Sequence, residues 1–124
     1  MSYARRETVT VTTASDGSAT AYSDPIDYGV LSAIRYVKTD FANGVDITIT
    51  SEATGETLWT QADVNASTTV APRQALHTTA GVAAVYASGG SAVLGPIAIV
   101  RDRIKFVIAQ GGDTKVGTFH AVLL

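Results

Sequence analysis

The chain has 124 residues and a formal net charge of −2; 46% of its residues are hydrophobic and only 16% are charged. This length supports one domain with a single core, and the slightly negative charge gives none of the basic surface that nucleic-acid binding uses. Because the chain contains no cysteine, disulfides, thiolate metal sites and cysteine nucleophiles are excluded. The low charge leaves much mildly apolar surface, which favours a protein that works inside an assembly.

Five short strands are expected in the first half of the chain, because apolar and polar residues alternate there and turn residues separate the stretches. The Asn43-Gly44 pair predicts a hairpin with a type I′ turn, since both residues tolerate a positive φ. Trp59 is expected to be a core anchor. The five expected strands are 8–12, 18–23, 30–38, 45–50 and 57–60.

The alternation within 30–38 also predicts which side chains share a face of that strand. Successive residues of a strand point to opposite faces. A regular strand would therefore have one face bearing Val30, Ile34 and Tyr36, and another bearing Leu31, Ala33 and Val37.

Three more strands are expected in the second half of the chain, and the last two, which form the final hairpin, carry the densest apolar signal. Ile104, Phe106 and Ile108 are expected to face the core, and the polar loop 110–115 predicts a closing hairpin at the centre of that core. The apolar stretch 82–87 is compatible with a strand or with one helical turn. The three expected strands are 96–100, 104–109 and 116–124.

These elements predict an all-β protein with a single domain spanning residues 1–124. Short strands with turn signals at about ten-residue intervals are typical of a mainly antiparallel β-sandwich or small barrel, with a jelly-roll arrangement as one option. Two segments fall outside the pattern. Residues 1–6 are a candidate N-terminal arm, and residues 65–81, NASTTVAPRQALHTTAG, are expected to form a long loop or arm.

The sequence offers no converging catalytic groups, so we expect no enzyme activity, no catalytic residues and no cofactor. Neither His77 nor His120 is followed by a second histidine or a carboxylate at ligand spacing, so no metal site is expected. No nucleophile signature accompanies His77 as a general base. The stretch 40–46 lacks the spacing of a calcium loop and is explained by a turn between solvated aspartates.

Residues 71–124 carry a series of motifs: APRQ followed by a histidine, then YASGG, RDRIKFVIAQGG and GTFH. Together with IRYVKTDFANGVDITIT upstream, they resemble small proteins encoded among the head genes of tailed bacteriophages. The resemblance covers roughly residues 30–124. It implies a structural protein of the virion. Such a protein is either a capsid decoration or cement protein that binds neighbouring capsid subunits, or a head–tail connector in a neck ring.

The partners implied by this resemblance are the major capsid protein or proteins of the neck and portal complex, with a homo-oligomer also expected. An extended arm is a common means of such contact. In the 65–81 segment, proline stiffens the chain, arginine and glutamine supply donors, and leucine offers an apolar anchor. The candidate contact residues are Tyr3, Arg5, Arg6, Pro72, Arg73, Gln74, Leu76 and His77.

Two alternatives stay open at this stage. A lid over a reaction site is the second interpretation of 65–81, but a lid needs a site beneath it. A carbohydrate-binding sandwich is the main alternative function, although Trp59 and the tyrosines are spread along the chain. The start, MSYARRETVTV, lacks the apolar region of a secretory signal, and no apolar run approaches membrane-spanning length. We therefore expect assembly in the host bacterial cytoplasm and residence in the virion, without membrane or nucleic-acid partners.

Overall fold

The structure, a computed structural model, describes residues 4–124 and has no helix within them. All strand pairs are antiparallel. The all-β, single-domain class predicted from alternation and turn spacing is therefore confirmed. The strands are β1 (Arg5–Thr12), β2 (Ala19–Tyr22), β3 (Ile26–Lys38), β4 (Asp46–Ser51), β5 (Thr57–Gln61), β6 (Thr68–Val70), β7 (Gln74–Ala75), β8 (Leu94–Gly95), β9 (Ile97–Asp102), β10 (Ile104–Ala109) and β11 (Val116–Leu123).

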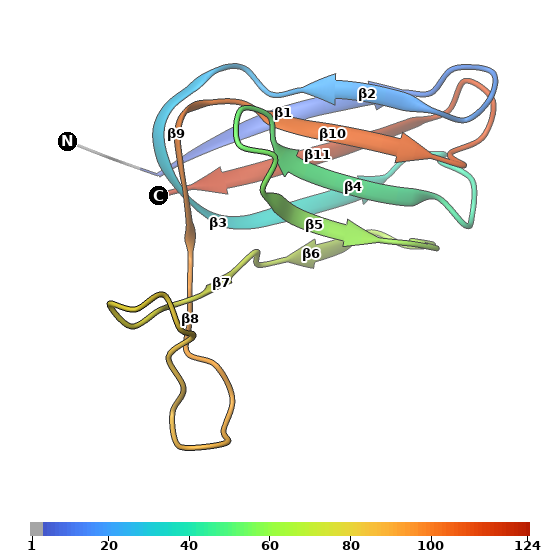
Figure 1. Cartoon of the computed structure of the whole chain (residues 1–124). Coiled ribbons are helices and arrows are strands. Elements are labelled where there is room, and N and C mark those ends of the chain that lie inside the picture. Colours follow the sequence, from blue (N-terminus) through green and yellow to red (C-terminus); the bar gives the residue numbers. More distant parts are fainter. Residues whose placement is uncertain (1–3) are drawn as a thin grey trace.

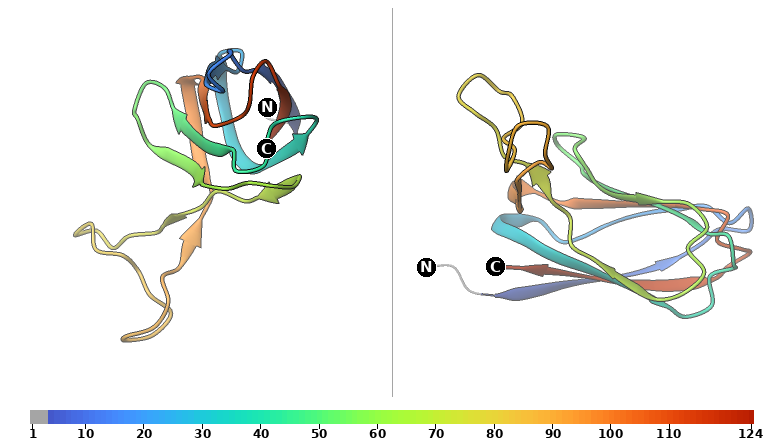
Figure 2. Two further views of the ribbon diagram at one scale, coloured as in Figure 1. Left: turned by 90° about the vertical axis from the view of Figure 1, so that its right-hand side faces the viewer. Right: turned by 90° about the horizontal axis from the view of Figure 1, so that it is seen from below.

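Two sheets face each other across one core (Figure 1). The first sheet has the order β1-β11-β3-β6, and β9 also pairs with β3; the second has the order β2-β10-β4-β5. Both sheets curl, so the body resembles a half-closed barrel when viewed along its length (Figure 2). A third, two-stranded ladder of β7 and β8 lies apart from both sheets.

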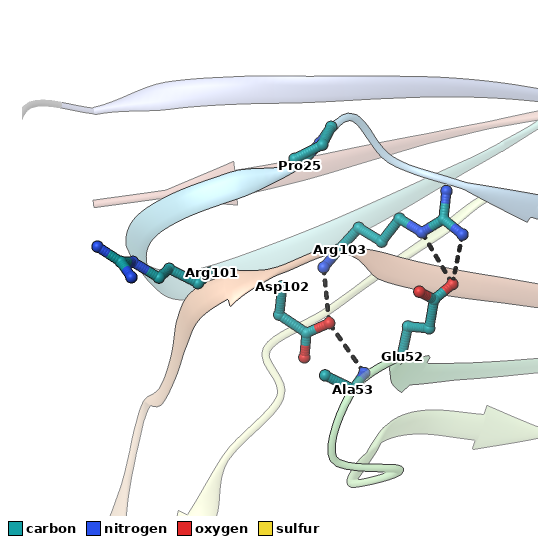
Figure 3. Close-up of a pocket in the computed structure, with 6 residues that line it drawn as sticks. All are labelled: Pro25, Glu52, Ala53, Arg101, Asp102 and Arg103. Carbon is teal, nitrogen blue, oxygen red and sulfur yellow. Dashed lines mark hydrogen bonds and ion pairs between the residues drawn. The ribbon is translucent and has the colours of Figure 1, made fainter.

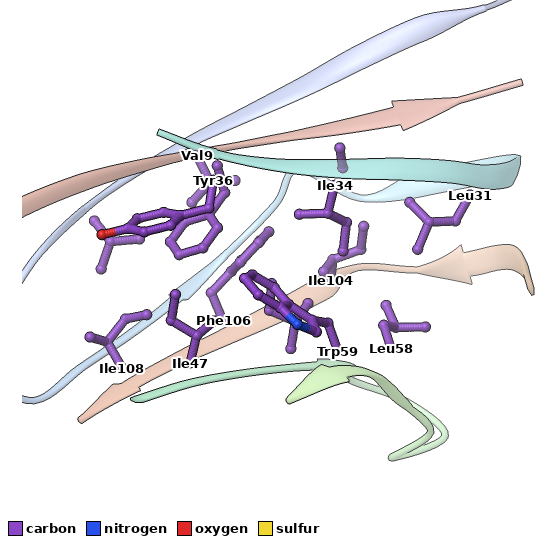
Figure 4. Packing of buried hydrophobic residues seen from close by; sticks show 14 of the residues in the cluster. Val9, Leu31, Ile34, Tyr36, Ile47, Leu58, Trp59, Ile104, Phe106 and Ile108 are labelled. Atoms are coloured by element: carbon purple, nitrogen blue, oxygen red, sulfur yellow. The ribbon is translucent and has the colours of Figure 1, made fainter. Parts of the chain in front are cut away.

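The core is filled by apolar side chains that point inward from both sheets (Figure 4). The rings of Tyr36 and Phe119 stack with centroids 5.2 Å apart, and Phe106 approaches Phe119 at 5.0 Å. Ile104, Phe106 and Ile108 are buried as predicted, and Trp59 is a buried core residue as well. Such burial of branched and aromatic side chains is the main favourable term in the stability of the fold.

The prediction for the faces of β3 is wrong at its N-terminal end. Leu31 is buried together with Ile34 and Tyr36, while Val30 faces outward. The register between β3 and β11 shifts at this point: Val122 pairs with Ala33, but Leu123 pairs with Leu31. One extra residue in β3 forms a β-bulge, which reverses the inward and outward alternation on one side of it.

Two predicted hairpins are wrong, because in each case the two strands lie in different sheets. Gly44 has the expected positive φ of 88°, but the strands on either side, β3 and β4, belong to different sheets. The loop 110–115 likewise carries the chain from the second sheet to the first. Each of the last two long strands is nonetheless central: β10 lies between β2 and β4, and β11 between β1 and β3.

Candidate functional site

A long excursion between β6 and β9 projects from the sandwich (Figures 1 and 2). Its stem is the β7–β8 ladder, in which Gln74 pairs with Gly95 and Ala75 with Leu94. Beyond the stem the chain forms two loops that turn near Gly81 and Gly89, both at positive φ. We call residues 74–95 the projecting arm. It begins inside the predicted 65–81 segment but extends fourteen residues past it.

Backbone hydrogen bonds close a ring at the point where the two loops leave the stem. The N–H of Leu76 donates to the carbonyl of Val93 at 2.9 Å, and the N–H of Val93 donates to the carbonyl of Ala84 at 2.9 Å. The N–H of Ala84 donates back to the carbonyl of Leu76 at 2.8 Å. Each residue of this ring is both donor and acceptor, so the projecting arm has an internal framework of its own.

The side chains of the projecting arm are unusually apolar for an exposed segment. Tyr86 is 77% exposed and Val82 62% exposed. The segment contains no aspartate, glutamate, lysine or arginine. Contiguous exposed apolar surface in a protein commonly marks an interaction site. The large exposed apolar residues of the projecting arm are Leu76, Val82, Val85, Tyr86 and Leu94.

The predicted contact residues of this region divide between the base and the projecting arm itself. Pro72 is buried at the base, and the guanidinium of Arg73 donates to the carbonyl of Ser32 in β3 at 3.1 Å. Gln74 lies in the stem, and the side chain of Leu76 packs against the backbone of Gly95. Pro72 and Arg73 therefore fix where the projecting arm leaves the sandwich.

His77 lies in the projecting arm beyond the stem. The same arm also holds exposed residues that were not among the predicted contact residues. His77 is exposed and forms an isolated bridge with Ala83. Val82, Tyr86 and Leu94 carry more of the apolar surface than His77 does. The signal that could have found them is the run of residues 74–95 without a single charge.

The expected N-terminal arm is not supported in its described part. Arg5 and Arg6 belong to β1 and pair with Leu123 and Val122 of β11. The guanidinium of Arg5 donates to the carbonyl of Tyr28 at 2.9 Å. Ladder hydrogen bonds and this contact hold both residues on the sandwich. Tyr3 lies outside the described residues.

A pocket of about 230 Å³ lies at the corner where β9 bends into β10 (Figure 3). The carboxylate of Asp102 accepts hydrogen bonds from the N–H of Ala53 at 2.9 Å and of Arg103 at 2.7 Å. Arg103 also pairs with Glu52 at 2.8 Å, and this hydrogen bond raises the pKa of the guanidinium. Its guanidinium carbon lies 3.8 Å from the centre of the Tyr22 ring.

These contacts give the charged side chains of the pocket a structural role: they hold the backbone at the corner between β9 and β10. Arg101, at the same corner, has a left-handed φ of 47°, and Asp102 holds the backbone beside it. The projecting arm joins the opposite, N-terminal end of β9. It therefore does not lie over this pocket, and the lid interpretation lacks the geometry it needs.

The two histidines lie in different parts of the fold, His77 in the projecting arm and His120 in β11. His120 lies on the outer face of β11, with its Nδ1 atom 3.2 Å from the hydroxyl of Thr8. Among residues 4–124, no three histidine, aspartate or glutamate side chains group in a way that could hold a metal ion. In the same residues no helix is long and apolar enough to cross a membrane.

No protein-family model and no curated protein sequence matches this chain. Among solved structures, the crystal structure of FLHE is similar over 98% of each chain, with a TM-score of 0.46 and 11% sequence identity. A likeness at this level does not inform on function. Five of the nine large exposed hydrophobic residues in the described part of the chain lie in the projecting arm.

Proposed function

We propose that this protein is a structural component of a tailed-bacteriophage virion, a cement or decoration protein that binds neighbouring capsid subunits through the projecting arm. One observation carries the proposal: an uncharged segment with its own backbone framework holds five large apolar side chains away from the core. Such a segment is suited to lie against another protein. The motifs that resemble phage head proteins name the class of partner.

The energetics support a docking role for this surface. Burial of an exposed valine or leucine side chain contributes about 1.5–3 kcal/mol. The five apolar side chains of the projecting arm are roughly half exposed or more, so docking would bury the rest of their surface and gain roughly 5 kcal/mol. The ordered framework reduces the conformational entropy lost on binding, which is the benefit of preorganisation.

The charge of the projecting arm restricts the kind of partner. Nucleic-acid binding rests on lysine and arginine contacts with phosphates, and residues 74–95 supply neither. Sugar binding uses clustered aromatic platforms, whereas the exposed Tyr22, Tyr28 and Tyr86 lie on β2, on β3 and in the projecting arm. A protein surface is the partner that this composition fits best.

The copy number of the protein in purified virions tests the proposal, measured by quantitative mass spectrometry against the major capsid protein. The cement role predicts hundreds of copies, in step with the capsid lattice. A count near a dozen would instead indicate a ring in the neck, which is the alternative virion role. Absence from purified particles would overturn the proposal as a whole.

A further inference from the structure

A second apolar surface begins at Leu94, at the end of the projecting arm, and continues along the strand that leaves it. From residue 94 to residue 100 the chain alternates strictly: Gly95, Ile97 and Ile99 are buried, and the residues between them are exposed. All of the exposed ones are also apolar. They are Leu94, Pro96, Ala98 and Val100, and we call them the outer stripe.

A strand that is apolar on both faces is typical of a strand covered on both faces. The inner face of β9 is covered by the core, but Val100 on its outer face is 58% exposed. The neighbouring strand β3 extends the apolar area, because Tyr28 pairs with Val100 and Val30 pairs with Ala98. Tyr28 is 50% exposed as well. The outer face at this end of the sheet therefore carries exposed apolar side chains on two adjacent strands.

The same strand has an open edge. In the described residues β9 pairs only with β3. Val30 exchanges both of its backbone hydrogen bonds with Leu124, at 2.9 and 2.8 Å, on the opposite side of β3. In an antiparallel ladder this makes Val30 and Ala98 a non-hydrogen-bonded pair. The N–H and C=O of Ala98 consequently point away from β3, toward the open edge.

We infer that this edge pairs with the same edge of a second copy of the chain, antiparallel and centred on Ala98. The two copies of Ala98 then exchange N–H···O=C bonds across a twofold axis, which is the isologous arrangement of most dimers. In this register Val100 of one copy faces Pro96 of the other, so the N–H of Val100 meets the proline carbonyl. Proline sits at one of the few strand positions that tolerate it, on an edge.

The charge pattern fits a second copy of the chain in the antiparallel orientation, because the stretch 94–100 carries no charge. The outer stripe ends at Arg101, beyond which charged residues resume. A parallel arrangement would place the two copies of Arg101 beside one another, and like charges there are unfavourable. The antiparallel arrangement instead sets Arg101 of each copy against the uncharged Gly95 of the other. An uncharged, self-complementary edge needs no partner with a matching charge.

Exposed edge strands normally carry lysine, proline or a β-bulge, which prevents them from pairing with another chain. Between residues 94 and 100 only Pro96 interrupts the edge, and it removes one donor. The dimer goes beyond the proposed binding of capsid subunits, since it uses the β9 edge rather than the loops of the projecting arm. It is therefore measurable in the purified protein without particles.

Sedimentation equilibrium of the wild type and of the variants Ala98→Lys and Ala98→Glu tests the inference. The wild type is expected to dimerise, and each variant alone is expected to raise the dimer dissociation constant at least about tenfold, because like charges meet at the axis. An equimolar mixture of the two variants is expected to dimerise again. Thr10→Lys adds the same charge to an exposed residue of β1 in the same sheet and is the matched control.

Three results would overturn the inference. One is a wild type that stays monomeric at concentrations up to about 100 μM, where even a weak interface is occupied. Another is a pair of variants that each associate as strongly as the wild type. The third is a mixture of the two variants that does not associate. Ala98 is exposed, so melting temperatures matching the wild type would show that the variants fold.

Discussion

The backbone N–H of Leu76 donates to the carbonyl of Val93 at 2.9 Å and closes one side of the hydrogen-bonded ring in the projecting arm. Both residues lie outside the two sheets of the sandwich. The order of this segment therefore depends on bonds among its own residues. The sandwich and the projecting arm should respond separately to substitution.

Ala84→Pro tests this separation. Proline has no N–H and cannot donate to the carbonyl of Leu76, so the ring opens. We expect amide hydrogen exchange at Leu76 and Val93 to accelerate while the melting temperature of the sandwich changes little. Ala87→Pro, outside the ring, is the matched control and should leave that protection in place. Equal protection in both variants would show that the ring does not order the segment.

Asp102 is predicted to stabilise the corner between β9 and β10. It accepts hydrogen bonds from the N–H groups of Ala53 and Arg103, and Asp102→Ala would leave both donors without this acceptor. Both hydrogen bonds are part-buried and go to a charged acceptor, so their loss is expected to cost about 1–3 kcal/mol in total. Asp102→Asn keeps an acceptor oxygen and should cost less. Chemical denaturation measures both; an alanine variant as stable as the wild type would contradict this role.

Tyr36 is predicted to be replaceable by phenylalanine without loss of stability. Its ring is fully buried, and within the described residues its hydroxyl has no hydrogen-bond partner. Removal of an unpartnered polar group is neutral or mildly stabilising, by less than about 1 kcal/mol near pH 7. A clear loss of stability in Tyr36→Phe would mean that the hydroxyl has a partner after all.

Tyr36 also makes the stability of the folded protein depend on pH. Burial raises the pKa of Tyr36 to about 12 in the folded protein, against about 10 in an unfolded chain. Below a pH of about 10 the Tyr36 hydroxyl keeps its proton in both the folded and the unfolded protein. As the pH rises through this interval the unfolded chain loses the proton first, so the wild type loses stability there. Denaturation at pH 8 and 11 should show a wider gap in favour of Tyr36→Phe at the higher pH.

The strands were predictable because their signals are local. Alternating β-branched residues identify β1 and β4, and Gly17 and Gly55 mark turns that the structure has at positive φ. Sheet membership was not predictable in the same way. The turn at Asn43-Gly44 suits a hairpin, yet the core forms only when β3 and β4 lie in opposite sheets. That choice depends on contacts between residues distant in sequence.

The sequence signals for the bulge in β3 and for the extent of the projecting arm are weaker than those for the strands. A bulge leaves the hydrophobic content of a strand unchanged and shifts only its phase, so Val30 and Leu31 exchange faces without a distinct sequence mark. Segment 82–94 is apolar, and apolar stretches are expected inside a core. Its lack of any charged residue, rather than its hydrophobicity, distinguishes it from an ordinary solvated loop.

The projecting arm is proposed to bind capsid subunits, and shortening it tests that proposal most directly. Gln74 and Gly95 are cross-strand partners, so replacing residues 75–94 with an Asn-Gly turn would shorten the segment and leave its base joined. Tyr86→Ser in the full chain, at the most exposed of the five apolar residues, is the smaller change.

The decisive measurement is binding of the intact and shortened proteins to virus particles assembled without this protein, with melting temperatures recorded alongside. We expect the intact protein to bind, the shortened form to lose binding at an unchanged melting temperature, and Tyr86→Ser to lie between them. Binding of the shortened form as tight as that of the intact protein would contradict the proposed role of the projecting arm.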